Sequence, residues 1–470
     1  MHSLSILGTS SDAGKSTLAF AITYLLHRRG IRVAPFKAQN VSNNARVCDS
    51  GGEIAQSQYF AAESIGLPTE SDFNPVLLKS GRGSSASLII NGHPAGEQDV
   101  REYYGTIGSL KPVVIEAFRR LQKRFDVIVA EGAGSPVELN LMEKDLSNIT
   151  IADTFDTKIV LVADIERGGV FASVWGVYNL LPEKLRSNVI GVIVNKFRGD
   201  ITLFDDGRQI IEERFGIPVL GVIPYRPFNL GFEDSQSLEN YVQSSQHGAI
   251  RAGVIRLPHI SNYTDLEPLV ADDEVHLDFV HSAAALPAYD LVILPGSKRT
   301  VADLRWLREH GFDEAFNAFK GTVVALCGGY EMMFERILDP EGIEEQPGSI
   351  TEGFGWLKGD ILFEKEKHVA KGCYDLFGLK IEGYEIHHGH SSGIYAEKER
   401  FFGTFVHGLF DSDAFREKLF RQIDPTYRGY DFAAYKSAAV AGFAVVAVEP
   451  VTPRPAAGQV PLAKITGVVP

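Results

Sequence analysis

Short apolar runs alternate with longer stretches of helical periodicity through the first half of the chain. The runs are rich in Val and Ile, and several are apolar almost throughout, which is typical of strands buried on both faces of a sheet. The stretches between them are long enough to hold crossover helices. We therefore predict an α/β fold with a parallel sheet. The expected strands are residues 4–8, 33–37, 127–131, 159–164, 189–195 and 219–223.

The same rhythm resumes after a polar stretch at 234–247 that has no periodicity. We place a linker at 236–248, between a first domain at 1–235 and a second α/β domain at 249–436. The second domain is expected to contain strands at 251–257, 291–295, 322–326 and 404–407. From residue 437 the composition changes to Ala, Val, Pro and Gly with almost no charge, so 437–470 is an atypical tail, either disordered or the product of an altered reading frame.

Composition narrows the class of partner. A chain of 470 residues is too long to form one ordinary hydrophobic core, so two domains are expected. A net charge of -14 argues against nucleic acid or an anionic membrane as the main partner, and a small molecule is the expected partner. The three cysteines, Cys48, Cys327 and Cys373, show no paired spacing, so we expect a reducing compartment. No apolar run approaches the roughly 18 residues of a membrane span, and we predict a cytoplasmic protein. The sequence leaves the oligomeric state open.

A glycine-containing turn follows the first expected strand and opens a helix. In this context backbone N–H groups and the helix dipole hold phosphates, a lysine offsets their charge, and a hydroxyl reaches Mg²⁺. The first glycine stands one place earlier than in the usual pattern, and the alternative is an ordinary strand–helix turn with an exposed lysine. We predict an ATP·Mg²⁺ site. Its residues are Gly8, Gly14, Lys15, Ser16 and Thr17.

Polar side chains end three of the other strands, where ligands bind in open α/β sheets. Glu131 offers an oxygen to Mg²⁺, and Lys37 can stabilise charge on a transferring phosphoryl group, although a surface lysine after a proline turn is an equal alternative. Asn195 can contact an adenine edge or simply form a turn. Asp49, in a glycine-flanked acidic segment, is a further metal candidate.

The second domain has a cysteine where an apolar run breaks into two glycines and a helix start. This pattern, with Cys327 followed by Gly328, predicts a nucleophile elbow, whereas a buried, inert thiol is the alternative. His407, expected at a strand end in the same domain, is the candidate base. Gly328 and Gly296 are placed to supply oxyanion N–H donors. The residue that would orient His407 is not apparent.

Three histidines crowd together at 387, 388 and 390 and raise the question of a zinc site. We argue against zinc, because neighbouring strand residues point to opposite faces and no carboxylate or cysteine has a suitable spacing.

At this point the chain resembles the cobyric acid synthase family over residues 3–436. The motifs that carry the resemblance are residues 8–17, 34–40, 49–56, 131–136, 163–171, 295–298, 326–330, 383–387 and 405–410. Ala38 departs from the family, which usually has Pro there, and this departure leaves the corrin contacts open.

The resemblance implies a P-loop NTPase-like domain similar to dethiobiotin synthetase, followed by a class I glutamine amidotransferase-like domain that lacks the usual third-member glutamate. Leu409, two residues after His407, is consistent with that lack. The resemblance also implies ATP, Mg²⁺ and glutamine, and a corrin substrate, adenosylcobyrinic acid a,c-diamide, that is amidated at its b, d, e and g carboxylates. Cys327 would release ammonia with help from His407. Acyl phosphates would form at Lys15, Ser16, Lys37 and Glu131.

Two other interpretations are considered. Cobyrinic acid a,c-diamide synthase contains the same two modules, but residues 36–40 and 164–169 favour cobyric acid synthase. A P-loop switch ATPase with a non-catalytic second half is the alternative of a different class. Such switches carry an early lysine where Ser10 stands, and they would not need both Cys327 and His407.

Overall fold

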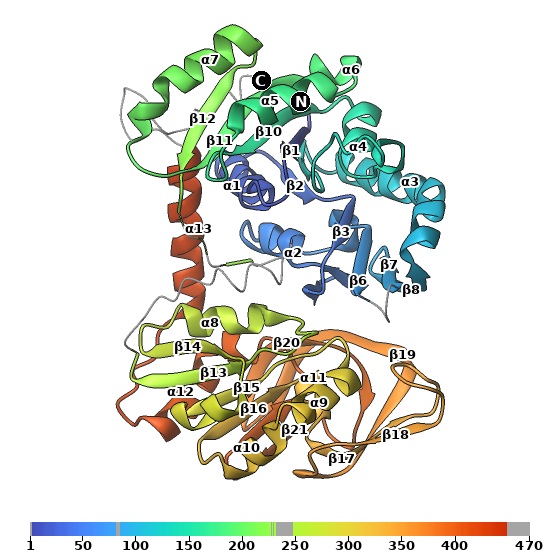
Figure 1. Ribbon diagram of the computed structural model, residues 1–470, viewed down its shortest axis with the longest axis vertical. Coiled ribbons are helices and arrows are strands. Elements are labelled where there is room, and N and C mark those ends of the chain that lie inside the picture. The colour runs from blue at the N-terminus through green and yellow to red at the C-terminus, as the bar shows by residue number, and fades with distance from the viewer. Residues whose placement is uncertain (1, 81–84, 227, 229, 232–247, 449–470) are drawn as a thin grey trace. The chain divides into compact units, whose positions relative to one another are not determined.

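The computed structural model describes residues 2–80, 85–226, 228, 230–231 and 248–448. The chain divides into two compact units (Figure 1). The first unit comprises Met1–Val41, Ile54–Phe228 and Ser437–Pro470, and the second comprises Ser42–Glu53 and Asn229–Lys436. Most of the predicted linker at 236–248 falls outside the described residues.

A parallel six-stranded sheet forms the centre of the first unit, which confirms the predicted fold class. The strand order is β12-β11-β10-β1-β9-β2, and β1 pairs with β10 on one side and β9 on the other. The strands are β1 Leu4–Gly8, β2 Val33–Phe36, β9 Val127–Glu131, β10 Lys158–Asp164, β11 Val189–Phe197 and β12 Val219–Pro224. From β1 the chain continues to β2 and β9 on one side of β1, and it then crosses to β10, β11 and β12 on the other side. A ligand is expected at this change of direction, at the carboxyl ends of the strands near β1.

Helices and a smaller sheet complete the first unit. The smaller sheet has the order β3-β6-β7-β8. Its strands are β3 Gln39–Val41, β6 Val76–Ser80, β7 Ser85–Ile90 and β8 His93–Asp99. The helices are α1 Lys15–Arg28, α2 Gln56–Glu63, α3 Val100–Gln122, α4 Ile149–Thr154, α5 Val170–Leu180, α6 Glu183–Arg186 and α7 Asp205–Phe215. Helix α3 begins at a capping box, in which the Asp99 carboxylate accepts from Arg101 N and the Glu102 carboxylate accepts from Asp99 N.

The second unit contains a six-stranded sheet of order β14-β13-β15-β16-β22-β21, parallel except for β21 at one edge. Its strands are β13 Ile250–Ile255, β14 Val275–Val280, β15 Leu291–Leu294, β16 Thr322–Leu326, β21 Tyr395–Lys398 and β22 Phe401–Thr404. A second sheet, β18-β17-β19-β20, contains a long hairpin. Its strands are β17 Phe334–Asp339, β18 Ser349–Glu352, β19 Leu357–Leu376 and β20 Leu379–His390. The helices are α8 Glu267–Val270, α9 Thr300–Glu309, α10 Phe312–Ala318, α11 Gly328–Glu331 and α12 Asp413–Ile423.

The predicted strand at 404–407 is wrong. Strand β22 ends at Thr404, because the Thr404 hydroxyl accepts a hydrogen bond from Val406 N at 3.1 Å and turns the chain away from the sheet. His407 therefore lies in the loop after the strand rather than at its end.

The segment Ser42–Glu53 groups with the second unit, although the sequence places it in the first domain. Its strand β4 is Ala45–Val47 and lies near β20, while β5, Glu53–Ala55, begins at its last residue. Three ion pairs hold the segment. They are Arg46–Asp411 at 3.0 Å, Asp49–Lys371 at 2.6 Å and Glu53–Lys367 at 2.5 Å.

The start of the atypical tail is helical. Helix α13 is Phe432–Val448, and its residues from Ser437 onward group with the first unit. The Phe443 ring packs against Phe228, with ring centroids 4.7 Å apart, and against Phe20, at 5.8 Å. Residues 449–470 fall outside the described part of the chain. Among the described residues, no helix combines the length and the apolar character needed to cross a bilayer.

Candidate active sites

The phosphate-loop residues of the first unit lie at the carboxyl end of β1. Gly14 precedes helix α1 with a φ of 93°, a left-handed conformation that favours glycine. The Lys15 side chain folds back over the loop, and its Nζ donates to the Ser10 carbonyl at 3.2 Å. A Cβ at Gly8 would approach Lys15 Nζ to 2.9 Å, so glycine leaves room for the lysine. Thr17 follows on the helix and is half-buried.

Glu131, at the end of β9, accepts hydrogen bonds from three polar side chains of the first unit. It is 2% exposed. Ser16 Oγ donates to its Oε1 at 2.6 Å, and Lys37 Nζ donates to the same oxygen at 2.8 Å. Gln58 Nε2 donates to Oε2 at 3.2 Å. The structure thus brings Ser16, Lys37 and Glu131 together as the sequence predicts, and it adds Gln58, which no local pattern marked.

Asn195 supports the phosphate loop. Its Nδ2 donates to the Ala13 carbonyl at 2.9 Å, and a Cβ at Gly14 would collide with the same amide. This amide group is therefore engaged with the loop, and an adenine contact by Asn195 stays a prediction.

Asp164 is a buried carboxylate that the sequence reasoning did not single out as a site residue. It ends β10, the neighbour of β1, and it pairs with Lys196 at 3.0 Å. Its Oδ1 accepts from Glu166 N at 2.8 Å. The sequence does contain a pattern that could have identified Asp164, because an apolar strand that ends in a carboxylate is the pattern that identified Glu131.

Asp49 belongs to the second unit, whereas Ser16 and Glu131 belong to the first. Its carboxylate pairs with Lys371 of β19. This ion pair holds the segment Ser42–Glu53, and a metal role for Asp49 stays a prediction.

Cys327 occupies a strained turn between β16 and helix α11. Its φ of 49° and ψ of -111° are unusual for a residue with a side chain, as expected at a nucleophile elbow. A Cβ at Gly328 would approach Ser297 N to 2.9 Å, and one at Gly329 would collide with the Leu294 carbonyl. The two glycines therefore let the elbow pack against the loop after β15. The Cys327 thiol donates to the Ile386 carbonyl at 3.6 Å.

His407 and Asp265 form a buried pair beside this elbow. His407 Nδ1 lies 2.7 Å from Asp265 Oδ2, and Gly408 N donates to Asp265 Oδ1 at 2.7 Å. His407 Nε2 is buried and has no hydrogen-bond partner among the described residues. This orphan nitrogen is the one that a catalytic base would direct at a thiol or a substrate. Asp265 supplies the orientation that the sequence left unassigned.

Burial and charge act against each other on His407. Burial disfavours the imidazolium, but the nearby Asp265 carboxylate and Cys327 sulfur outweigh it and raise the pKa of His407 to about 10. A histidine held between a carboxylate and a thiol is suited to form an imidazolium–thiolate pair.

Gly296, in the loop after β15, and Gly328, the first residue of α11, are the predicted oxyanion donors. A Cβ at Gly296 would lie 3.2 Å from His407 Cε1, and one at Gly328 would lie 2.9 Å from Ser297 N. The loop after β15 therefore lies against both the histidine and the elbow. Oxyanion binding by these glycines stays a prediction.

Two carboxyl groups, the buried Glu331 and the half-buried Glu344, lie near the start of helix α9. Glu331, the last residue of α11, accepts from Thr300 Oγ1 at 2.6 Å. Glu344 caps helix α9, accepting from Thr300 N and Val301 N at 2.8 Å each. Burial raises the pKa of Glu331 to about 7 and that of Glu344 to about 8.

Comparisons with known proteins match each half of the chain to a family model. Residues 4–230 match the CobQ/CobB/MinD/ParA nucleotide binding domain, and residues 251–415 match the CobB/CobQ-like glutamine amidotransferase domain. A protein named cobyric acid synthase from Acinetobacter baylyi is 56% identical over 445 residues, which cover 94% of this chain and 96% of the relative. Another of that name, from Chlorobium phaeobacteroides, is 39% identical and covers 90% of this chain and 92% of the relative.

A nucleotide-binding α/β unit joined to a glutamine amidotransferase unit defines a glutamine-dependent ligase. The near-full-length identity then narrows this class: the chain belongs to the cobyric acid synthase family, as the sequence motifs predicted.

Proposed function

We propose that the protein converts the b, d, e and g carboxylates of adenosylcobyrinic acid a,c-diamide into carboxamides, with ATP and glutamine as co-substrates. Membership of the family supports a corrin as the substrate and glutamine as the nitrogen donor, and the nucleotide-binding domain supports ATP as the phosphoryl donor. The observation that carries the glutaminase half is the arrangement of Cys327 at a strained elbow beside the buried pair His407–Asp265. We also propose that the enzyme acts in the cytoplasm and binds neither nucleic acid nor membrane, in keeping with its net charge of -14.

The glutaminase chemistry follows from this arrangement. The Cys327 sulfur attacks the side-chain carbonyl of glutamine, and His407 passes a proton to the departing nitrogen, so that ammonia leaves a thioester. Water then attacks the thioester, His407 accepts its proton, and glutamate is released. Asp265 holds the imidazole in one tautomer throughout. N–H groups of Gly296 and Gly328 would stabilise the oxyanion.

The ligase chemistry needs an activated carboxylate, because a carboxylate oxygen is a poor leaving group. Transfer of the γ-phosphoryl group of ATP gives an acyl phosphate, and ammonia displaces phosphate from it. Lys15 and Lys37 are the cations placed to balance charge on the transferring group.

Magnesium fits the donor set at this site. The Ser16 hydroxyl and the Glu131 carboxylate are hard oxygen ligands that already lie 2.6 Å apart. These two residues would hold the ion, which supplies charge neutralisation for the phosphates when it is bound.

The direct test is to incubate the purified protein with ATP, Mg²⁺, glutamine and the adenosylated diamide, and to follow the corrin by mass spectrometry. Four successive conversions of carboxyl to carboxamide, with release of glutamate and ADP, are expected. An unchanged corrin, despite ATP turnover by folded protein, would contradict the proposal and favour the switch ATPase. In a parallel incubation with cobyrinic acid, amidation of its a and c carboxylates, with the diamide left unchanged, would favour cobyrinic acid a,c-diamide synthase.

A further inference from the structure

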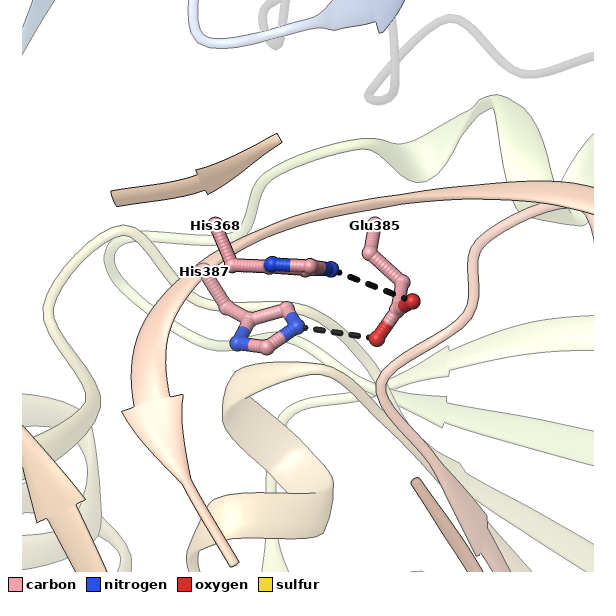
Figure 2. A group of neighbouring side chains, drawn as sticks. All are labelled: His368, Glu385 and His387. Carbon is pink, nitrogen blue, oxygen red and sulfur yellow. Dashed lines mark hydrogen bonds and ion pairs between the residues drawn. The ribbon is translucent and has the colours of Figure 1, made fainter. Parts of the chain in front are cut away.

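Three side chains that can ligate a metal ion gather on the hairpin β19–β20 of the second unit, as Figure 2 shows. His368 comes from β19, and Glu385 and His387 come from β20. Residues 385 and 387 share one face of their strand because strand side chains alternate. The antiparallel register places His368 opposite His387. One ligand atom from each residue lies within 4.8 Å of the other two.

This geometry overturns the reason that argued against zinc. The carboxylate partner does exist, since each oxygen of the Glu385 carboxylate faces one of the two rings, and the second histidine comes from the other strand of the hairpin. His388 is not part of the group, because its Nδ1 lies 3.0 Å from the Glu364 carbonyl. His390 Nε2 is 3.6 Å from Glu364 Oε2, so we leave it outside the ligand set as well.

The separations between ligand atoms match those around a small ion. His387 Nε2 lies 3.1 Å from Glu385 Oε2, and His368 Nε2 lies 3.4 Å from Glu385 Oε1. Two ligands that are each about 2.0–2.1 Å from a tetrahedral ion stand roughly 3.3 Å apart. A small shift of the side chains would therefore bring all three within bonding distance of one ion.

The hydrogen bonds of His387 fix which nitrogen is available. Its Nδ1 lies 2.7 Å from the Gly389 carbonyl, which only accepts, so Nδ1 carries a hydrogen. In the neutral ring, Nε2 then directs a lone pair at the Glu385 carboxylate. Two lone pairs at 3.1 Å repel, and a positive charge must lie between them. That charge is either a proton, on Nε2 or on the carboxylate, or a metal ion.

We propose that His368, Glu385 and His387 bind one divalent transition-metal ion, with zinc as the best match to two imidazoles and a carboxylate. The second shell is already present: the Gly389 carbonyl fixes the tautomer of His387, and the Phe405 ring stacks on its imidazole with centroids 4.1 Å apart. The His368 side chain is 43% exposed and gives the ion a path from solvent.

The site has a structural consequence for the glutaminase. Ile386 lies between Glu385 and His387 in β20, and its carbonyl accepts a hydrogen bond from the Cys327 thiol. A bound ion would hold this part of β20 beside the nucleophile. The ion's role is to position the strand, and the three ligands are not catalytic residues.

The test uses full-length protein freed of metal by a chelator and titrated with Co²⁺, whose visible absorption reports coordination by protein ligands. Excess Mg²⁺ is present to occupy oxygen-only sites, and Zn²⁺ is then added to displace the Co²⁺. The main variant is His368→Gln, because this half-exposed residue tolerates change best. Glu385→Gln is the second variant. His310→Gln is the matched control, since this exposed histidine stacks on Trp306 and lies outside the group.

We expect one Co²⁺ per chain, displaced by Zn²⁺, with binding weakened at least about tenfold in both ligand variants and unchanged in His310→Gln. Wild-type protein that binds no stoichiometric metal would overturn the proposal and leave a protonated His387–Glu385 ion pair. Equal binding by wild type and both folded ligand variants would overturn it too. The readout is metal binding, so it is independent of the proposed ligase activity.

Discussion

Asp265 Oδ2 lies 2.7 Å from His407 Nδ1, although the two residues are 142 positions apart in the chain. Asp265 belongs to the short 3-10 helix Tyr263–Leu266 and is buried, and it also accepts a hydrogen bond from Gly408 N. The carboxylate therefore holds both the imidazole and the backbone that follows it. In the proposed glutaminase site, the acid that contacts the histidine therefore precedes Cys327 in the chain rather than following His407.

Asp265→Asn should reduce glutamine-dependent amidation by about 10²–10⁴-fold while leaving amidation from added ammonia near the wild-type rate. Asparagine can still accept from Gly408 N, but it no longer selects the productive tautomer of His407. Steady-state rates with the two nitrogen sources check this. Asp278→Asn is the control, since it alters another Asp–His pair, with His276 at 3.2 Å. Equal losses with glutamine and ammonia would argue against the assigned role.

Glu131→Gln should reduce amidation at least about 100-fold with either nitrogen source, because the glutamine side chain cannot neutralise Lys37 or serve as an anionic metal ligand. The Mg²⁺ concentration needed for half-maximal rate should rise. Glu116→Gln, an exposed change on α3, is the control. A variant that loses only glutamine-dependent activity would place Glu131 outside the ligase site.

Gly14→Ala should abolish ATP-dependent turnover and destabilise the first unit by about 1–3 kcal/mol. Alanine is strained at a φ of 93°, and its Cβ would collide with the Asn195 amide. Gly30→Ala separates the two effects, since Gly30 has a φ of 79° but nothing within 4 Å of an added Cβ. ATP binding and thermal unfolding are measured for both. Similar ATP binding by both variants would show that loop packing against Asn195 is unimportant.

Glu344→Gln should change how stability depends on pH. The pKa of Glu344 is raised by burial from 4.5 to about 8, so the folded state retains a proton that the unfolded state releases. This contribution to stability is complete below pH 4.5 and is lost as the pH rises towards about 8. The glutamine side chain does not titrate, so the variant does not lose stability in this way. Its free energy of unfolding relative to wild type should therefore increase between pH 5 and pH 8. Urea unfolding across this range checks the slope. Glu345→Gln, which changes the ion pair with Arg305 at the neighbouring position, is the control.

The parts of the fold and of the sites that could be predicted are those determined by residues close together in the sequence. The strand–turn–helix around Lys15 and the elbow at Cys327 each occupy one short stretch, so the residues that create the geometry are neighbours in the chain. Glu131 was predictable for a related reason, because the carboxyl ends of parallel strands meet at one edge of the sheet.

The parts that were missed depend on register and long-range packing. Asp265 reaches His407 only through the tertiary fold, and the group formed by His368, Glu385 and His387 depends on how two long strands pair. The segment Ser42–Glu53 has no periodicity that assigns it to a domain, and ion pairs such as Arg46–Asp411 place it with the second unit. Those contacts have no signature in a single sequence.

The most direct test of the whole account compares Cys327→Ala with wild type on the same corrin, ATP and Mg²⁺, with either glutamine or ammonia. The account predicts that the variant makes no amide from glutamine but converts the carboxylates with added ammonia, since the thiol serves only to release nitrogen. Amidation from glutamine at the wild-type rate by Cys327→Ala would contradict the central claim.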